Sequence, residues 1–133
     1  MKIVKLTDTV SVSEQIAPRD IEEIASAGFK VVVNNRPDGE SADQPTSEEI
    51  SRAAQAAGLS YYYLPITAGN FPGPDVSIMA SLLDNADEPV LAFCRTGTRC
   101  TNLWVATRSQ EEVDSAMGHA KALGYDLAMS RPK

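Results

Sequence analysis

The residues of this sequence with the clearest capacity for chemistry lie together in the stretch PVLAFCRTGTRCTNLW, residues 89–104. An apolar run ends at Cys94, and a short loop follows that contains Gly97 and two arginines, Arg95 and Arg99. Successive backbone amides of such a loop can point at one anion, and their positive field lowers the pKa of a thiol. The pattern predicts that Cys94 is a nucleophile and that Arg99 binds the anion it attacks.

The other residues of this loop complete the predicted anion site. Thr96 and Thr98 flank the glycine, and a helix is expected to begin near Cys100 with its amino end facing the same anion. The alternative is a structural thiol, because free cysteine is among the most buried residue types. A strand-terminal cysteine followed by glycine, arginine and a helix start favours a chemical role.

Length, composition and charge limit the classes of protein. The 133 residues, of which 43% are hydrophobic, predict a single domain over residues 1–133. A net charge of −6 disfavours nucleic acid and anionic membranes as partners, and no apolar stretch approaches the length that spans a bilayer. We expect a cytoplasmic protein that binds a small anionic substrate and uses no cofactor. No metal site is expected either, since His119 has no ligands at metal spacing and is predicted to lie on a solvated helix surface.

Predicted strands alternate with predicted helices along the chain. Strands are expected in IVKL, FKVVVNN, SYYYLPI and PVLAFC, the last three of them buried, and helices in APRDIEEIASAG, TSEEISRAAQAAG, PDVSIMASLLDNA and the segment after the cysteine loop. On that last helix, Leu103, Trp104 and Ala106 are expected to form the packed side. This order predicts an α/β three-layer sandwich with a mainly parallel central sheet. The Cys94 loop then lies at the carboxyl end of the sheet, where such folds bind ligands.

Several separated segments of the chain together resemble one protein family. The segments are VSEQIAPRDIEEIASAGFKVVVNNRPDGE, DQP, AAGLSYYYLPI and PVLAFCRTGTR. Over residues 11 to about 110 they resemble the beta-lactamase-hydrolase-like, phosphatase-like domain family, a bacterial group related in fold to dual-specificity and tyrosine phosphatases. The resemblance implies a cysteine-phosphatase-like fold and hydrolysis of phosphomonoesters through a phosphorylated Cys94.

The cysteine loop departs from the pattern of tyrosine phosphatases in two respects. Those enzymes are similar in having histidine before the cysteine and five residues between cysteine and arginine. Here Phe93 precedes Cys94, and only four residues separate Cys94 from Arg99. Six-residue loops that begin CR resemble those of rhodaneses, which carry sulfur as a persulfide. A rhodanese-like sulfurtransferase that takes a sulfane sulfur donor is therefore an alternative, and an oxyanion-binding or redox-sensing module is another.

Three further residues have competing interpretations. Dual-specificity phosphatases are similar in having an aspartate after the strand equivalent to YYYLPI, as general acid, and the nearest candidate here is Asp75. We expect Asp75 instead to cap the following helix. The resemblance implies that Arg36 and Asp38, in NNRPDGE, border the pocket. A simple turn is the alternative for both and is favoured for Asp38.

Cys100 occupies the position after the loop arginine. Phosphatases of this type usually have serine or threonine there, hydrogen-bonded to the catalytic sulfur. The substitution predicts that the Cys94 and Cys100 thiols are neighbours, which would allow a disulfide if their Cα atoms lie roughly 4.4 to 6.8 Å apart. A passive replacement for serine is the simpler interpretation.

Overall fold

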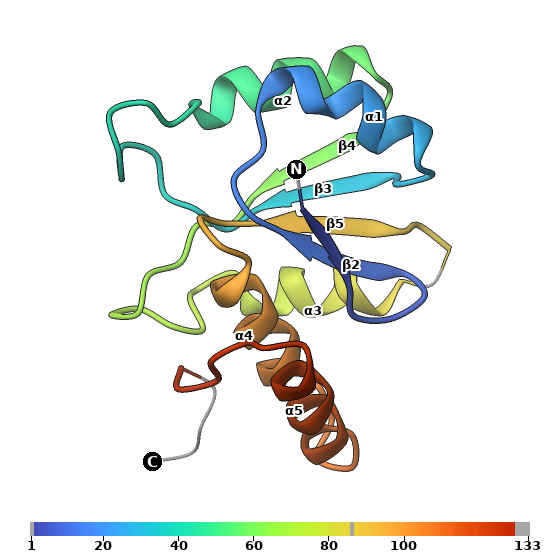
Figure 1. The fold of residues 1–133 in the computed structure, drawn as a ribbon, viewed down its shortest axis with the longest axis vertical. Coiled ribbons are helices and arrows are strands. Elements are labelled where there is room, and N and C mark those ends of the chain that lie inside the picture. The colour runs from blue at the N-terminus through green and yellow to red at the C-terminus, as the bar shows by residue number, and fades with distance from the viewer. Residues whose placement is uncertain (1, 86, 130–133) are drawn as a thin grey trace.

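A computed structural model describes residues 2–85 and 87–129 and contains a five-stranded sheet in the order β1-β2-β5-β3-β4 (Figure 1). Strands β2, β5, β3 and β4 run parallel, and β1 pairs antiparallel with β2. The strands are β1 (Ile3–Lys5), β2 (Val10–Ser13), β3 (Val31–Asn34), β4 (Ser60–Tyr63) and β5 (Val90–Phe93).

Helices lie on both sides of this sheet (Figure 1). One side carries the short 3-10 helix η1 (Pro18–Asp20), α1 (Ile21–Ser26) and α2 (Ser47–Ala56). The other carries α3 (Val76–Asp84), α4 (Thr98–Ala106) and α5 (Val113–Ala122). The predicted three-layer α/β sandwich with a mainly parallel sheet is therefore confirmed.

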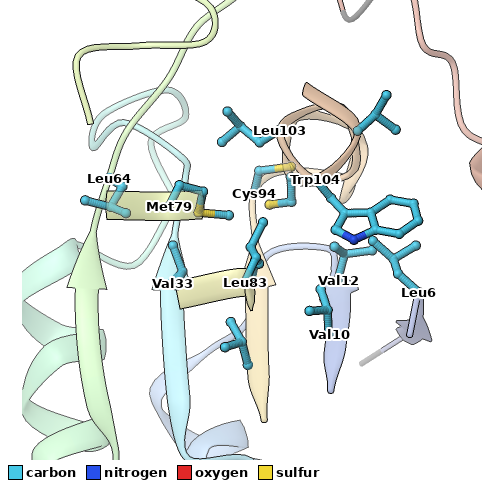
Figure 2. Packing of buried hydrophobic residues seen from close by; sticks show 14 of the residues in the cluster. Leu6, Val10, Val12, Val33, Leu64, Met79, Leu83, Cys94, Leu103 and Trp104 are labelled. Atoms are coloured by element: carbon cyan, nitrogen blue, oxygen red, sulfur yellow. The ribbon is translucent and has the colours of Figure 1, made fainter. Parts of the chain in front are cut away.

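The central strands divide their side chains between two cores, because successive residues of a strand point to opposite faces. Val32 and Phe93 pack with Ile24 and Ile50 beneath α1 and α2. On the other face, Val33 packs in the cluster that Figure 2 shows, which also contains these labelled residues: Leu6, Val10, Val12, Leu64, Met79, Leu83, Cys94, Leu103 and Trp104. Cys94 thus belongs to the core under α3 and α4 as well as to the loop.

Two strands differ from the expectations. Strand β2 was not predicted, because VSVS is short and half of it is serine, yet all four residues are buried between β1 and β5. Strand β4 was predicted to be buried, and this is wrong. It is the sheet edge, where Tyr62 and Tyr63 are 37% and 38% exposed.

The helix after the cysteine loop begins at Thr98, slightly earlier than expected. Leu103 and Trp104 are buried as predicted, whereas the prediction for Ala106 is wrong, because this last residue of α4 is exposed. No helix in the described part of the chain combines the length and apolar composition that crossing a membrane requires.

The register of the sheet brings three loops together. Phe93, the last residue of β5, is paired with Ser13 of β2 and with Asn34 of β3. Because these strands are parallel and end at the same level, the residues that follow them lie together at the carboxyl end of the sheet. This end of the sheet holds the candidate site.

Candidate active site

The Cys94 loop is fixed by its backbone. The Cys94 amide donates to the Ser13 carbonyl at 3.4 Å, and the Gly97 amide donates to Cys94 Sγ at 3.1 Å. Gly97 has φ +89°, and a Cβ there would lie 3.4 Å from the Tyr125 hydroxyl and 3.5 Å from the Ser13 carbonyl oxygen. Glycine is needed for this left-handed turn, which folds the chain back over the sulfur.

Helix α4 begins directly after this turn. The Gly97 carbonyl accepts hydrogen bonds from the Thr101 amide at 3.0 Å and from the Thr101 hydroxyl at 2.8 Å. The free amides of the first helical turn consequently face the loop, and they carry the partial positive charge of a helix amino end.

The pKa of Cys94 is lowered to about 5 by its surroundings. The largest cause is a hydrogen bond from the Cys100 thiol, and backbone amides of Cys100, Thr96 and Arg99 add to it against the opposing effect of burial. Cys94 is therefore a thiolate at neutral pH. A thiolate is the form of cysteine that acts as a nucleophile.

Cys100 has the opposite electrostatic character. Its pKa is raised well above the ordinary value, first by burial and then by the neighbouring Cys94 sulfur, so its thiol stays protonated. The two cysteines are neighbours, as the sequence predicts, and neither is in a disulfide. A disulfide between them stays a prediction.

Arg99 follows the loop in α4, and residues outside the loop bond its guanidinium group. Its Nη1 and Nη2 donate to the two carboxylate oxygens of Glu40 at 2.8 and 2.6 Å, and Nη1 also donates to the Ile66 carbonyl at 3.0 Å. The Arg99 guanidinium, followed by Arg36, keeps the pKa of Glu40 below its ordinary value despite partial burial. Glu40 is thus an ionised partner of the predicted anion-binding arginine.

Arg36 is buried and bonds the same carboxylate as Arg99. Its Nε donates to Glu40 Oε1 at 3.0 Å, and its Nη1 donates to Gln15 Oε1 at 3.0 Å. Asp38 is exposed and turns away: its carboxylate accepts from the Ser47 amide at 2.8 Å, and its own amide donates to the Tyr63 hydroxyl at 2.9 Å. Arg36 therefore faces the site, whereas Asp38 holds the turn and the start of α2.

A cavity of about 740 Å³ lies over these groups. Its lining is almost entirely polar: Arg36, Arg95, Arg99, Glu40, Asp43, Gln15, Ser41, Gln44 and Pro45. Glu40 and Gln15 were missed by the sequence analysis. Glu40 stands in the quoted segment NNRPDGE, two residues beyond Asp38, and Gln15 follows the unpredicted strand β2.

The two loop threonines contribute backbone more than side chains. The Thr96 amide is directed at Cys94 Sγ, while the Thr96 and Thr98 hydroxyls bond each other at 3.0 Å. Both side chains line a separate depression of about 320 Å³ beside Tyr125. Of these two residues, only the Thr96 amide is shown facing the sulfur, because the Thr98 amide donates to the Thr96 hydroxyl at 3.5 Å.

Asp75 lies away from the Arg99 cavity. It stands just before α3 and lines a narrow apolar pocket that includes Leu64 and Leu103. The expectation that its carboxylate caps α3 is wrong, because the side chain makes no capping hydrogen bond. The helix begins directly after the Pro-Asp sequence, and the burial of Met79 and Leu83 stabilises it.

His119 lies on exposed helix surface, as predicted, with a ring nitrogen 2.9 Å from the Leu6 carbonyl oxygen. Within the described ranges, histidine, cysteine, aspartate and glutamate side chains form no cluster suited to a metal ion.

Comparison with known proteins identifies the family. Residues 2–111 match the family described as beta-lactamase hydrolase-like protein, phosphatase-like domain. The chain belongs to this family. The beta-lactamase hydrolase-like protein of Agrobacterium fabrum is 32% identical over 130 residues, which cover 96% of this chain and 30% of that protein. The chain of this phosphatase-like domain therefore spans less than a third of that relative's length.

Solved structures agree with this family assignment. A candidate phosphatase from Neisseria meningitidis is 38% identical, with a TM-score of 0.81 over 96% of this chain and 92% of that one. Kinase associated phosphatase, with its catalytic site cysteine substituted by serine, shares the fold at a TM-score of 0.68 and 15% identity, over 96% and 86% of the two chains. The predicted family is confirmed, and the relationship supports the predicted class of cysteine-dependent phosphatases, which are hydrolases.

Proposed function

We propose that this domain hydrolyses phosphate groups through Cys94. The observation that carries the proposal is a cysteine at a strand end with a pKa near 5, ringed by loop amides and adjoined by Arg99. Family membership supports the same chemistry. The expected substrate is a small anion, because three arginines outnumber the two carboxyl groups in the lining of the cavity beside the loop.

In the proposed reaction, the Cys94 thiolate attacks phosphorus and the bond from phosphorus to the leaving oxygen breaks. Loop amides and the inner edge of the Arg99 guanidinium stabilise the negative charge on the transferring phosphoryl group. Water then attacks the cysteinyl-phosphate, which releases inorganic phosphate and restores the thiolate. Glu40 acts as a positioning residue, since it holds the outer edge of the guanidinium.

Sulfur transfer is the second candidate, and one observation favours it. Amides of Thr96, Gly97, Arg99 and Cys100 are directed at the Cys94 sulfur itself, as a loop that stabilises a persulfide requires. The thiolate would take the outer sulfur of thiosulfate, with release of sulfite, and pass it to cyanide as thiocyanate. Neither step needs a proton donor for the leaving group.

The two functions are separated by assaying one preparation with 4-nitrophenyl phosphate and with thiosulfate plus cyanide. We expect vanadate-sensitive phosphate release that falls at least about a thousandfold in Cys94→Ser, because removing a nucleophile abolishes the covalent route. Thermal unfolding of both proteins shows that the variant is folded.

Thiocyanate formation that depends on Cys94, without phosphate release, would replace the phosphatase proposal by the sulfurtransferase. Phosphate release that persists in Cys94→Ser would contradict Cys94 as the nucleophile.

A further inference from the structure

The cavity beside the Cys94 loop, which Arg95 and Arg99 line, offers no evident proton donor for a leaving group. Among described residues, the carboxyl groups that line it belong to Glu40 and Asp43. The pKa of Glu40 is lowered by Arg99, so it is ionised. Asp43 is exposed, and its carboxyl group accepts a hydrogen bond from the Ser41 hydroxyl at 2.9 Å. An alkoxide would therefore leave without the protonation that general acid catalysis supplies.

The same cavity contains a buried cation that the reaction at Cys94 does not use. Arg36 is 5% exposed and lines the cavity. Its Nε and Nη1 are engaged by Glu40 and Gln15, while Nη2 makes no hydrogen bond within the described residues. Nη2 is not fully buried, so it is open to the solvent of the cavity and can donate a hydrogen bond to an anion there.

Glu40 cannot neutralise both arginines of the site. Arg36 Nε and Arg99 Nη2 bond the same Glu40 oxygen, at 3.0 and 2.6 Å, so the two guanidinium groups are neighbours that share one negative charge. Arg95 adds a further positive charge to the lining. Against these three arginines the lining holds two carboxyl groups, those of Glu40 and Asp43, so its formal charge stays positive beside the group that Arg99 binds.

We infer that the substrate is a phosphoric anhydride, whose leaving group is itself a phosphate that Arg36 receives. This inference rests on the proposed phosphatase function and adds its substrate class. An anhydride fits the site because its leaving phosphate is stable as an anion and needs no proton. Arg36 supplies positive charge where an ester-cleaving enzyme would supply an acid.

The chemical step balances without a further reactant. The bond from Cys94 Sγ to the attacked phosphorus forms, the bridging P–O bond breaks, and its electron pair stays on the leaving phosphate beside Arg36. Water then cleaves the S–P bond and yields the second phosphate. The rest of the leaving group is hydrophilic, because the lining residues include no aromatic side chain and Pro45 is their one apolar member.

The test compares three substrates in the presence of a metal chelator. These are inorganic diphosphate, 4-nitrophenyl phosphate, whose leaving group is good but carries one charge at most, and glycerol 3-phosphate, whose alkoxide is a poor leaving group. We expect kcat/KM to fall in that order. Arg36→Gln should lower kcat/KM for diphosphate by about tenfold more than for 4-nitrophenyl phosphate, since one charge-assisted hydrogen bond is lost.

Two further variants separate this role from folding. Arg36→Lys keeps the buried charge and should recover part of the diphosphate activity. Arg108→Gln removes another partly buried arginine, which pairs with Asp84 at 2.8 Å outside the site, and should leave the substrate ratio unchanged. Equal losses for both substrates in Arg36→Gln, or glycerol 3-phosphate cleaved as well as diphosphate, would overturn the inference. Absence of Cys94-dependent phosphate from all three substrates would overturn the proposed phosphatase itself.

Discussion

Of the three loops that meet at the candidate site, those after β5 and β3 are fixed by different interactions. The β5 loop, residues 94–97, is held by backbone groups and by core packing around Cys94 (Figure 2). The β3 loop, residues 35–46, is held largely by side chains. In it, Gln44 donates to the Pro37 carbonyl at 2.9 Å and accepts from the Glu40 amide at 3.1 Å.

The difference indicates that the two loops have different roles. Backbone amides of the β5 loop act on the sulfur and, in the proposed reaction, on the phosphoryl group, and they are the same for almost any side chain. Side chains of the β3 loop, Arg36 and Glu40, bring charge that each substitution can change. We therefore expect substitutions in the β5 loop and its helix to affect the chemical step, and those in the β3 loop to affect substrate choice or stability.

Arg99 joins the two loops, so its removal should have the largest effect. We expect Arg99→Ala to lower kcat/KM for 4-nitrophenyl phosphate by about a hundredfold or more, as loss of a transition-state donor does in other enzymes. Steady-state kinetics measure this, with Arg108→Ala as the matched control because Arg108 also pairs with a carboxylate. Similar small losses in both variants would mean that Arg99 is only structural.

An effect of intermediate size is expected for the two cysteines, Cys94 in the β5 loop and Cys100 in α4. Alkylation of Cys94 should have its midpoint near pH 5. Cys100→Ala removes the thiol hydrogen bond and should raise that midpoint by about one pH unit, whereas Cys100→Ser keeps a donor and should preserve it. Rates of iodoacetamide modification against pH measure both. An unchanged midpoint in Cys100→Ala would mean that the backbone amides alone lower the pKa of Cys94.

The lowered pKa of Cys94 also predicts the pH dependence of stability. Between pH 5 and the ordinary thiol value of about 8.5, the unfolded chain binds a proton at this residue and the folded chain does not. The contribution of Cys94 is thus complete above that upper value and is lost as pH falls through 5. The free energy of unfolding of wild type minus that of Cys94→Ser should rise with pH across this interval.

The smallest effect is expected in the β3 loop away from the cavity. Asp38→Ala removes the acceptor for the Ser47 amide at the start of α2 and should lower the free energy of unfolding by about 1 kcal/mol. Asp43→Ala is the matched control, because Asp43 bonds only a hydroxyl of its own loop. Urea denaturation of both variants measures the difference. Equal stability would mean that the hydrogen bonds of Tyr63 and Gln44, and not that of the Asp38 carboxylate, stabilise the turn.

Much of the fold and part of the site follow from local sequence patterns. Thr46 and Glu49 form the reciprocal cap that starts α2, as the TSEE sequence predicts, because both partners lie within one helical turn. Cys94 at a strand end and Gly97 at the turn were equally predictable, since each depends on neighbours a few residues away, whereas Arg99 was expected in the loop and lies in the first turn of α4. The exposure of β4 was not, because an edge strand has the same composition as a central one.

The tertiary structure alone decided the charges around the sulfur. Glu40 and Arg99 are 59 residues apart in the sequence, and they meet because β3 and β5 are parallel neighbours that end at the same level. Gln15 reaches Arg36 from the loop after β2, a strand that the sequence analysis missed and that pairs with β5 on the side opposite β3. The pKa of a thiol or carboxylate depends on the groups within a few ångströms, so the sequence determined which residue could react, and the sheet register determined which charges act on it.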